Sequence, residues 1–144
     1  MNIKRFSFDE VVDMCLQQIP NVKQHIIGVC RGGLIPAVII ARQMKKPLLV
    51  YTPRADNNHL SNLSGVTFIE EIVAKGRTVN DIIKFCESNN ITDYNIISLV
   101  IDKDAPHYDC LIGNRLEEWV EYPWELESTF GLRHLAHEKV YSNV

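Results

Sequence analysis

The sequence predicts an α/β fold in which helices flank a mainly parallel central sheet. Short apolar runs rich in β-branched residues alternate with segments that carry apolar residues at helical spacing. Two of these runs lead into glycine-containing turns and then into helices, the order found in βαβ units. With 144 residues, 46% of them hydrophobic, the chain can bury a real core. We therefore expect a single domain over residues 1–144.

The first helix is predicted from its start signal and its periodicity. Ser7 and Glu10 have the spacing of a capping box, in which each residue satisfies the other's backbone N–H. Apolar residues recur at helical spacing from Phe8 to Ile19, and Pro20 ends the pattern. We interpret this segment as an amphipathic helix packed on the sheet, without chemistry of its own.

The second unit combines a strand, a glycine turn and a helix. His25–Cys30 reads as a buried strand, and Leu34–Met44 is apolar nearly all round, as a covered helix would be. Between them lie Arg31, Gly32 and Gly33. Backbone N–H groups in such a turn suit an anion. A βα turn that binds nothing is the alternative interpretation.

A third strand is predicted over Pro47–Tyr51, and the polar segment Thr52–Gly65 follows it as a loop. Long loops in compact domains are often functional lids, although a solvated loop explains this composition equally well.

The stretch from Val66 to Thr78 carries the densest chemistry. Strand formers lead to adjacent carboxylates, Glu70 and Glu71, and then to the turn Ala74–Thr78. A helical pattern begins at Val79. The helix start offers N–H groups to a phosphate, whereas the carboxylates suit hydroxyl groups or a hydrated magnesium ion.

The remaining segments complete the predicted sheet. Asn95–Ile101 reads as a strand, Tyr108–Ile112 as a short strand, and Trp119–Glu125 as an aromatic-rich irregular segment. Leu132–Tyr141 has helical spacing, and we interpret its two histidines as surface residues rather than metal ligands.

Composition excludes several classes of function. The net charge of −3 argues against a nucleic-acid-binding surface. No apolar run approaches the roughly 20 residues that span a bilayer, and the N-terminus lacks the apolar core of a signal peptide. The four scattered cysteines indicate reduced thiols. We expect a cytoplasmic protein with neither nucleic-acid nor membrane partners.

Four segments, in order, resemble the type I phosphoribosyltransferases, and most closely their xanthine-guanine (6-oxopurine) branch. Val66–Thr78 is similar to the family's phosphoribosyl-pyrophosphate (PRPP) signature, and Gly28–Pro36 to its pyrophosphate loop. Lys103 stands where those enzymes keep a lysine on the exocyclic oxygen of the purine. Trp119–Glu125 resembles their base-binding segment, and the resemblance covers about Phe6 to Glu125.

The resemblance implies a role for each matched position. It implies a hood formed mainly by about residues 103–130, Mg²⁺ as cofactor, PRPP and a purine as substrates, and a homodimer or homotetramer. The implied catalytic residues are Glu70, Glu71 and Arg31. The implied phosphate-binding residues are Arg31, Gly32, Gly33, Ala74, Lys75, Gly76, Arg77 and Thr78. The implied base-binding residues are Lys103, Trp119 and Val120, and the implied metal ligands are Glu70, Glu71 and Glu125.

The chain departs from the family pattern close to the implied PRPP site. Ala74 replaces an aspartate that the 6-oxopurine enzymes usually carry, Lys75 replaces a threonine, and Glu71 replaces an aspartate. Cys30 replaces a serine. Two hypotheses follow. The first is a phosphoribosyltransferase that makes a nucleoside 5′-monophosphate and pyrophosphate from PRPP and one of the bases guanine, hypoxanthine and xanthine. The second is a catalytically impaired relative that binds nucleotide or PRPP and acts as a sensor, sequestering or regulatory module. Transfer to an unusual base is a weaker third.

Overall fold

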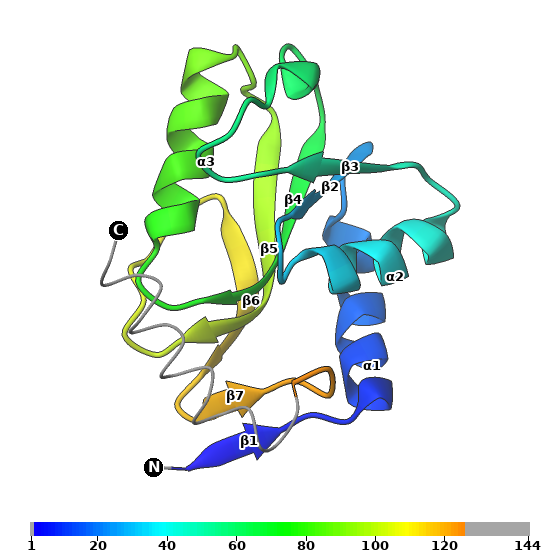
Figure 1. The fold of residues 1–144 in the computed structure, drawn as a ribbon, viewed down its shortest axis with the longest axis vertical. Helices are drawn as coiled ribbons and strands as arrows, with labels where there is room; N and C mark the ends of the chain where they lie inside the picture. The colour runs from blue at the N-terminus through cyan, green and yellow to red at the C-terminus, as the bar shows by residue number, and fades with distance from the viewer. Residues whose placement is uncertain (1, 126–144) are drawn as a thin grey trace.

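The computed structural model describes residues 2–125, which form a parallel five-stranded sheet with helices on both faces (Figure 1). The strand order is β3-β2-β4-β5-β6, and every neighbouring pair is parallel. The strands are β2 (His25–Val29), β3 (Leu48–Tyr51), β4 (Val66–Val73), β5 (Tyr94–Asp102) and β6 (Leu111–Leu116). The predicted fold class is confirmed.

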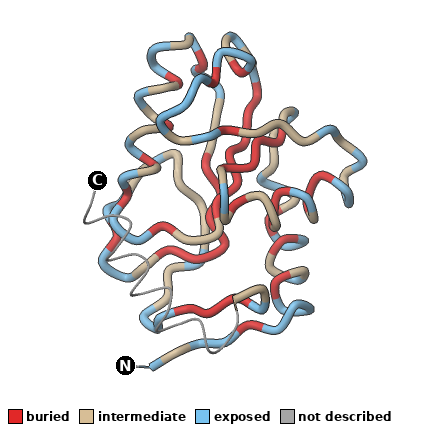
Figure 2. Tube along the Cα trace, viewed as in Figure 1, coloured by how far each residue is buried: buried red, intermediate tan, exposed pale blue. Residues whose placement is uncertain are grey.

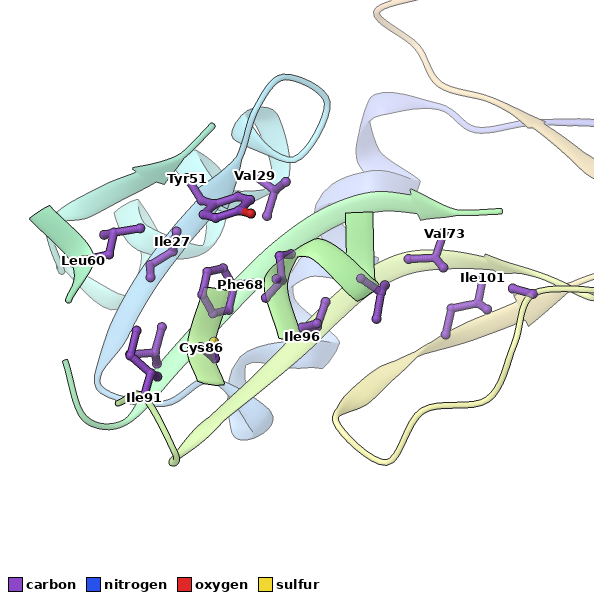
Figure 3. Packing of buried hydrophobic residues seen from close by; sticks show 14 residues of the cluster. Ile27, Val29, Tyr51, Leu60, Phe68, Val73, Cys86, Ile91, Ile96 and Ile101 are labelled. Atoms are coloured by element: carbon purple, nitrogen blue, oxygen red, sulfur yellow. The ribbon is translucent and has the colours of Figure 1, made fainter. Parts of the chain in front are cut away.

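Two apolar clusters, one on each face, hold the helices on the sheet. Helix α3 (Arg77–Ser88) buries Val79, Ile82 and Cys86 in the cluster that also contains Phe68 of β4 (Figure 3). Helices α1 (Phe8–Gln18) and α2 (Leu34–Met44) cover the opposite face. Buried residues follow the central strands in Figure 2, because strands covered on both faces are apolar throughout.

The start of α1 confirms the predicted capping box. The Glu10 backbone N–H donates to Ser7 Oγ at 3.1 Å, and the Ser7 N–H donates to Glu10 Oε1 at 3.2 Å. A short 3₁₀ turn, Ile19–Asn21, follows the helix where proline was expected to end it. Another 3₁₀ turn, Asn58–Leu60, lies inside the predicted loop 52–65.

Strand β4 is longer than predicted and carries the two carboxylates within it. The run of strand formers before the acid pair covers only Val66–Ile69, but Ile72 and Val73 also pair, with Val100 and Ile101 of β5. Pairing with a long neighbour therefore extends the strand past the acid pair. Helix α3 begins two residues before the periodic pattern, with Gly76 as N-cap at φ +81°.

A small second sheet was missed from the sequence. β1 (Ile3–Arg5) pairs in parallel with β7 (Trp119–Glu121), so the interpretation of residues 119–125 as wholly irregular is wrong. Three-residue strands leave too few positions to show a period. The strand predicted at Tyr108–Ile112 is also displaced, since β6 begins at Leu111.

Other expectations concern the thiols, the membrane and the tail. The four cysteines are free thiols, as predicted. Within residues 2–125, no helix has the length and apolar character needed to cross a membrane. The helix predicted over 132–141, with its two histidines, lies outside the described residues.

Candidate functional site

The glycine turn after β2 lies in contact with the end of β4. A Cβ atom on Gly33 would overlap the carbonyl oxygen of Ile69 and lie 2.8 Å from that of Val29. A Cβ atom on Gly32 would overlap the carboxyl group of Glu71. Glycine is therefore required at Gly33, where an added side chain would meet backbone, whereas at Gly32 its absence of a side chain leaves room for the Glu71 carboxyl. Gly33 and Glu71 are 38 residues apart in the sequence. In the structure, the turn Arg31–Gly33 and the acid pair nevertheless form one surface.

The same turn is anchored to the edge strand. The Cys30 N–H donates to the Tyr51 carbonyl at 2.9 Å, and Thr52 Oγ1 donates to Cys30 Sγ at 3.6 Å. The Cys30–Arg31 peptide bond is cis. Arg31 is exposed at the beginning of the turn, where its guanidinium is available to an anion.

Glu70 is the buried member of the acid pair, with a 9% exposed side chain. Burial and the nearby Glu71 charge raise its pKa to about 8, while hydrogen bonds from the Glu71 and Ile72 backbone lower it only in part. In the unliganded protein, this carboxyl therefore keeps its proton near neutral pH.

We predict that Glu70→Gln stabilises the metal-free protein at alkaline pH. The folded-state pKa lies above the ordinary value of 4.5, so folding loses free energy as pH rises from about 4.5 to about 8. The variant removes this loss, which is on the order of a few kcal/mol above pH 8. Below pH 4.5 the variant should have nearly the same folding free energy as the wild type. Thermal unfolding in the presence of a chelator measures the stability at high and at low pH, and the exposed Glu87→Gln is the control. An equal pH dependence of stability in the variant and the wild type would contradict the prediction.

Tyr122 joins the segment after β7 to the acid pair. Its buried hydroxyl donates to the backbone carbonyl of Glu71, and its ring stacks on Trp124 with centroids 4.6 Å apart. Burial raises the pKa of Tyr122, and the charges of Glu71 and Glu125 raise it further. Tyr122 was not singled out from the sequence, because only the fold brings it to β4.

The three carboxylates predicted as metal ligands all act electrostatically on this tyrosine. Glu71, Glu125 and Glu70 each raise the pKa of Tyr122. Among residues 2–125, however, no three histidine, cysteine or acidic side chains form a ready metal site. This donor set fits magnesium, which binds one or two carboxylates and takes its other ligands from water and substrate phosphates.

The turn after β4 leads into a helix start that no side chain caps. Ala74, Lys75 and Arg77 are exposed, whereas Gly76 is buried. A Cβ atom on Gly76 would overlap the hydroxyl of Tyr108, which donates to Asn80 Oδ1 at 3.0 Å. The uncapped start of α3 offers N–H groups and a positive dipole end to a phosphate. Tyr108, which sequence reasoning missed, covers one side of it.

A pocket of about 460 Å³ lies beside the end of β5 and the start of β7. It brings together Lys103 and Trp119, which sequence reasoning had paired as base-binding residues. The side chain of Val120 is buried in the core, so a ligand here can meet only its backbone. The two phosphate-type turns do not line this pocket, whose lining residues are Asn2, Asp102, Lys103, Glu117, Glu118 and Trp119.

No protein-family model and no curated protein matches the sequence. Solved structures do match the fold. A purine phosphoribosyltransferase from Pyrococcus horikoshii is 22% identical with a TM-score of 0.67, over 88% of this chain and 95% of that one. A xanthine-guanine-hypoxanthine phosphoribosyltransferase from Helicobacter pylori is 16% identical with a TM-score of 0.69, over 93% and 98%.

A third similar structure is a hypothetical protein from Neisseria gonorrhoeae with bound ppGpp. It is 15% identical with a TM-score of 0.69, over 96% of this chain and 98% of that one. At these identities the likeness shows the fold alone. The chain therefore has the type I phosphoribosyltransferase fold, as the four sequence segments predicted.

Proposed function

We propose that this protein is a purine phosphoribosyltransferase, which converts PRPP and a 6-oxopurine to a nucleoside 5′-monophosphate and pyrophosphate. The observation that carries the proposal is the contact between the Arg31–Gly33 turn and Glu71. It joins a pyrophosphate-type turn to ribose-type carboxylates, at the same sheet edge as the uncapped helix start at Gly76 and Arg77. Crevices at the carboxyl ends of parallel strands are the usual ligand sites in such sheets.

Each end of PRPP meets groups of suitable chemistry. Arg31 with the backbone N–H of Gly32 holds the pyrophosphate, whereas the Gly33 N–H donates to the Val29 carbonyl at 3.0 Å. Glu70 and Glu71 accept hydrogen bonds from the ribose hydroxyls. The backbone of the Ala74–Thr78 turn, with the Lys75 and Arg77 charges and the Thr78 hydroxyl, binds the 5′-phosphate.

The chemical step breaks the bond between C1 and the pyrophosphate oxygen and forms a bond from C1 to a purine nitrogen. The leaving pyrophosphate takes the electron pair, and the sugar passes through an oxocarbenium-like state. Holding the two reactants in line supplies much of the acceleration. Glu70, Glu71 and Glu125 would hold magnesium, which would supply charge neutralisation as the bond breaks.

The composition of the pocket supports guanine as the preferred base. The Lys103 ammonium donates only, so it favours an oxo group over an amino group. Trp119 offers an indole face for stacking. Asp102, Glu117 and Glu118 line the same pocket. Their carboxylates accept the N–H donors of guanine and oppose the 2-oxo group of xanthine, which places lone pairs or negative charge there.

Ala74 cannot take the proton from the base nitrogen, the task that an aspartate at this position would perform. We predict that Ala74→Asp raises kcat for guanine, roughly tenfold or more, because a positioned general base contributes up to 10²–10⁴-fold. Steady-state kinetics against wild type measure the change, and Ala74→Asn is the matched uncharged control. An unchanged kcat would indicate that proton removal does not limit turnover.

A nucleotide-binding module without catalysis is the second candidate. Two observations support it. Ala74 stands where the 6-oxopurine enzymes usually carry an aspartate, and the similar protein from Neisseria gonorrhoeae was solved with bound ppGpp. In both cases we propose a cytoplasmic homo-oligomer with a hood formed mainly by about residues 103–130, of which 126–130 lie outside the described residues.

Pyrophosphate release discriminates between the two. Purified protein with magnesium and PRPP should release pyrophosphate when guanine is added, faster than with hypoxanthine or xanthine. No turnover with any base, together with micromolar nucleotide binding in calorimetry, would select the second candidate.

A further inference from the structure

The loop after β5 is gathered around a single guanidinium. Arg115 of β6 lies opposite Ile101 in the β5–β6 register, and its half-buried side chain reaches across the loop. Its Nη1 donates to three backbone carbonyls, at 3.0 Å to Asp102, 3.4 Å to Lys103 and 2.7 Å to Ala105. Its Nη2 lies 3.4 Å from the Pro106 carbonyl and 3.4 Å from His107 Nδ1.

These contacts organise the loop from its centre. The loop also has a local turn, in which the Asp104 N–H donates to Asp102 Oδ1 at 2.9 Å and the Ala105 N–H to the Asp102 carbonyl at 3.0 Å. Converging carbonyl oxygens repel one another unless a donor lies between them. A planar guanidinium has five donors in a fixed fork, so it can serve several carbonyls at once, whereas an ammonium cannot hold the same geometry.

The loop carries Lys103, and the orientation of Lys103 depends on its backbone. The Lys103 carbonyl accepts from Arg115, while Lys103 lines the 460 Å³ pocket with Trp119. Arg115 itself does not line that pocket. Any effect of Arg115 on a base in the pocket must therefore pass through the loop.

We propose that Arg115 is a positioning residue for purine recognition: it fixes the 102–107 loop so that the Lys103 ammonium points at the 6-oxo group of the base. The role of the pocket rests on the proposed function, whereas the ordering of the loop does not. No motif marked Arg115 in the sequence, because its partners are backbone carbonyls 9 to 13 residues earlier in the chain and a ring nitrogen of His107.

The first test is independent of any substrate. Hydrogen exchange of the Lys103, Asp104 and Ala105 amides is compared in wild type, Arg115→Met and Arg115→Lys, with exposed Arg42→Met as control. Exchange of these loop amides should be at least tenfold faster in Arg115→Met than in wild type, and of intermediate rate in Arg115→Lys. Exchange of the strand amides should be unchanged in both variants. Equal loop exchange in Arg115→Met and wild type would overturn the proposal.

The second test measures base and PRPP separately in the full-length protein. Arg115→Met should raise the KM for guanine about tenfold or more, while the KM for PRPP stays within twofold. In a Lys103→Met background the same substitution should change the guanine KM less than twofold, because the group that it positions is gone. Equal effects in both backgrounds, or a parallel rise in the KM for PRPP, would overturn the proposal. Absence of any 6-oxopurine turnover or binding in the wild type contradicts the proposed function instead, and the exchange test still decides the role of Arg115.

Discussion

Gly32→Ala should lose on the order of 100-fold in phosphoribosyl transfer while leaving the fold nearly as stable as wild type. The added methyl group meets the Glu71 carboxyl, which is the end of a flexible side chain and can move aside. That movement displaces a carboxylate proposed to hold the ribose, and a displacement of about 1 Å can cost 10²-fold in rate. Steady-state kinetics with guanine and PRPP, together with thermal unfolding, measure the two effects.

Gly33→Ala is the matched control, because its methyl group meets backbone instead. The carbonyl oxygens of Ile69 and Val29 belong to paired central strands and cannot withdraw. We expect it to lose about 3 kcal/mol or more of folding free energy, at the upper end of overpacking. If Gly32→Ala instead unfolded the protein and Gly33→Ala were benign, the arrangement of the turn against β4 would be wrong.

Trp119→Ala should weaken guanine or GMP binding by about 1–3 kcal/mol, roughly 5- to 150-fold, because one stacking face for the base is removed. The indole is 38% exposed at the rim of the pocket, so the cost to folding should be small. Isothermal titration calorimetry measures the affinity, and thermal unfolding measures the stability.

Phe8→Ala provides the comparison. Phe8 is a 53% exposed aromatic residue on α1, and it does not line the pocket. Its removal should leave nucleotide affinity unchanged. Unchanged affinity in Trp119→Ala as well would place the base elsewhere.

The sequence was sufficient for the features that depend on local order. Alternating strand and helix patterns predicted the parallel sheet, and Ser7 with Glu10 predicted the helix start. The glycines after β2 predicted a turn that offers backbone N–H groups to an anion, but not the close approach to β4 that the structure shows at Gly32 and Gly33. Lys103 and Trp119, matched through resemblance, do share one pocket.

The features that depend on distant contacts were not predictable in the same way. β1 pairs with β7 across more than 110 residues, and strands of three residues show no period. Tyr122, Tyr108 and Arg115 act through backbone or side-chain atoms that only the folded chain brings near. Single polar or aromatic residues of this kind carry no motif, so their roles appear only with coordinates.

The most direct measurement of the central claim is a crystal structure with GMP bound. The account predicts one nucleotide spanning the site, with its 5′-phosphate on the Ala74–Thr78 turn, its ribose hydroxyls at Glu70 and Glu71, and its purine against Trp119 with the 6-oxo group at Lys103. A nucleotide bound outside the sheet edge, or one whose phosphate contacts the 460 Å³ pocket while the turn after β4 stays empty, would contradict it.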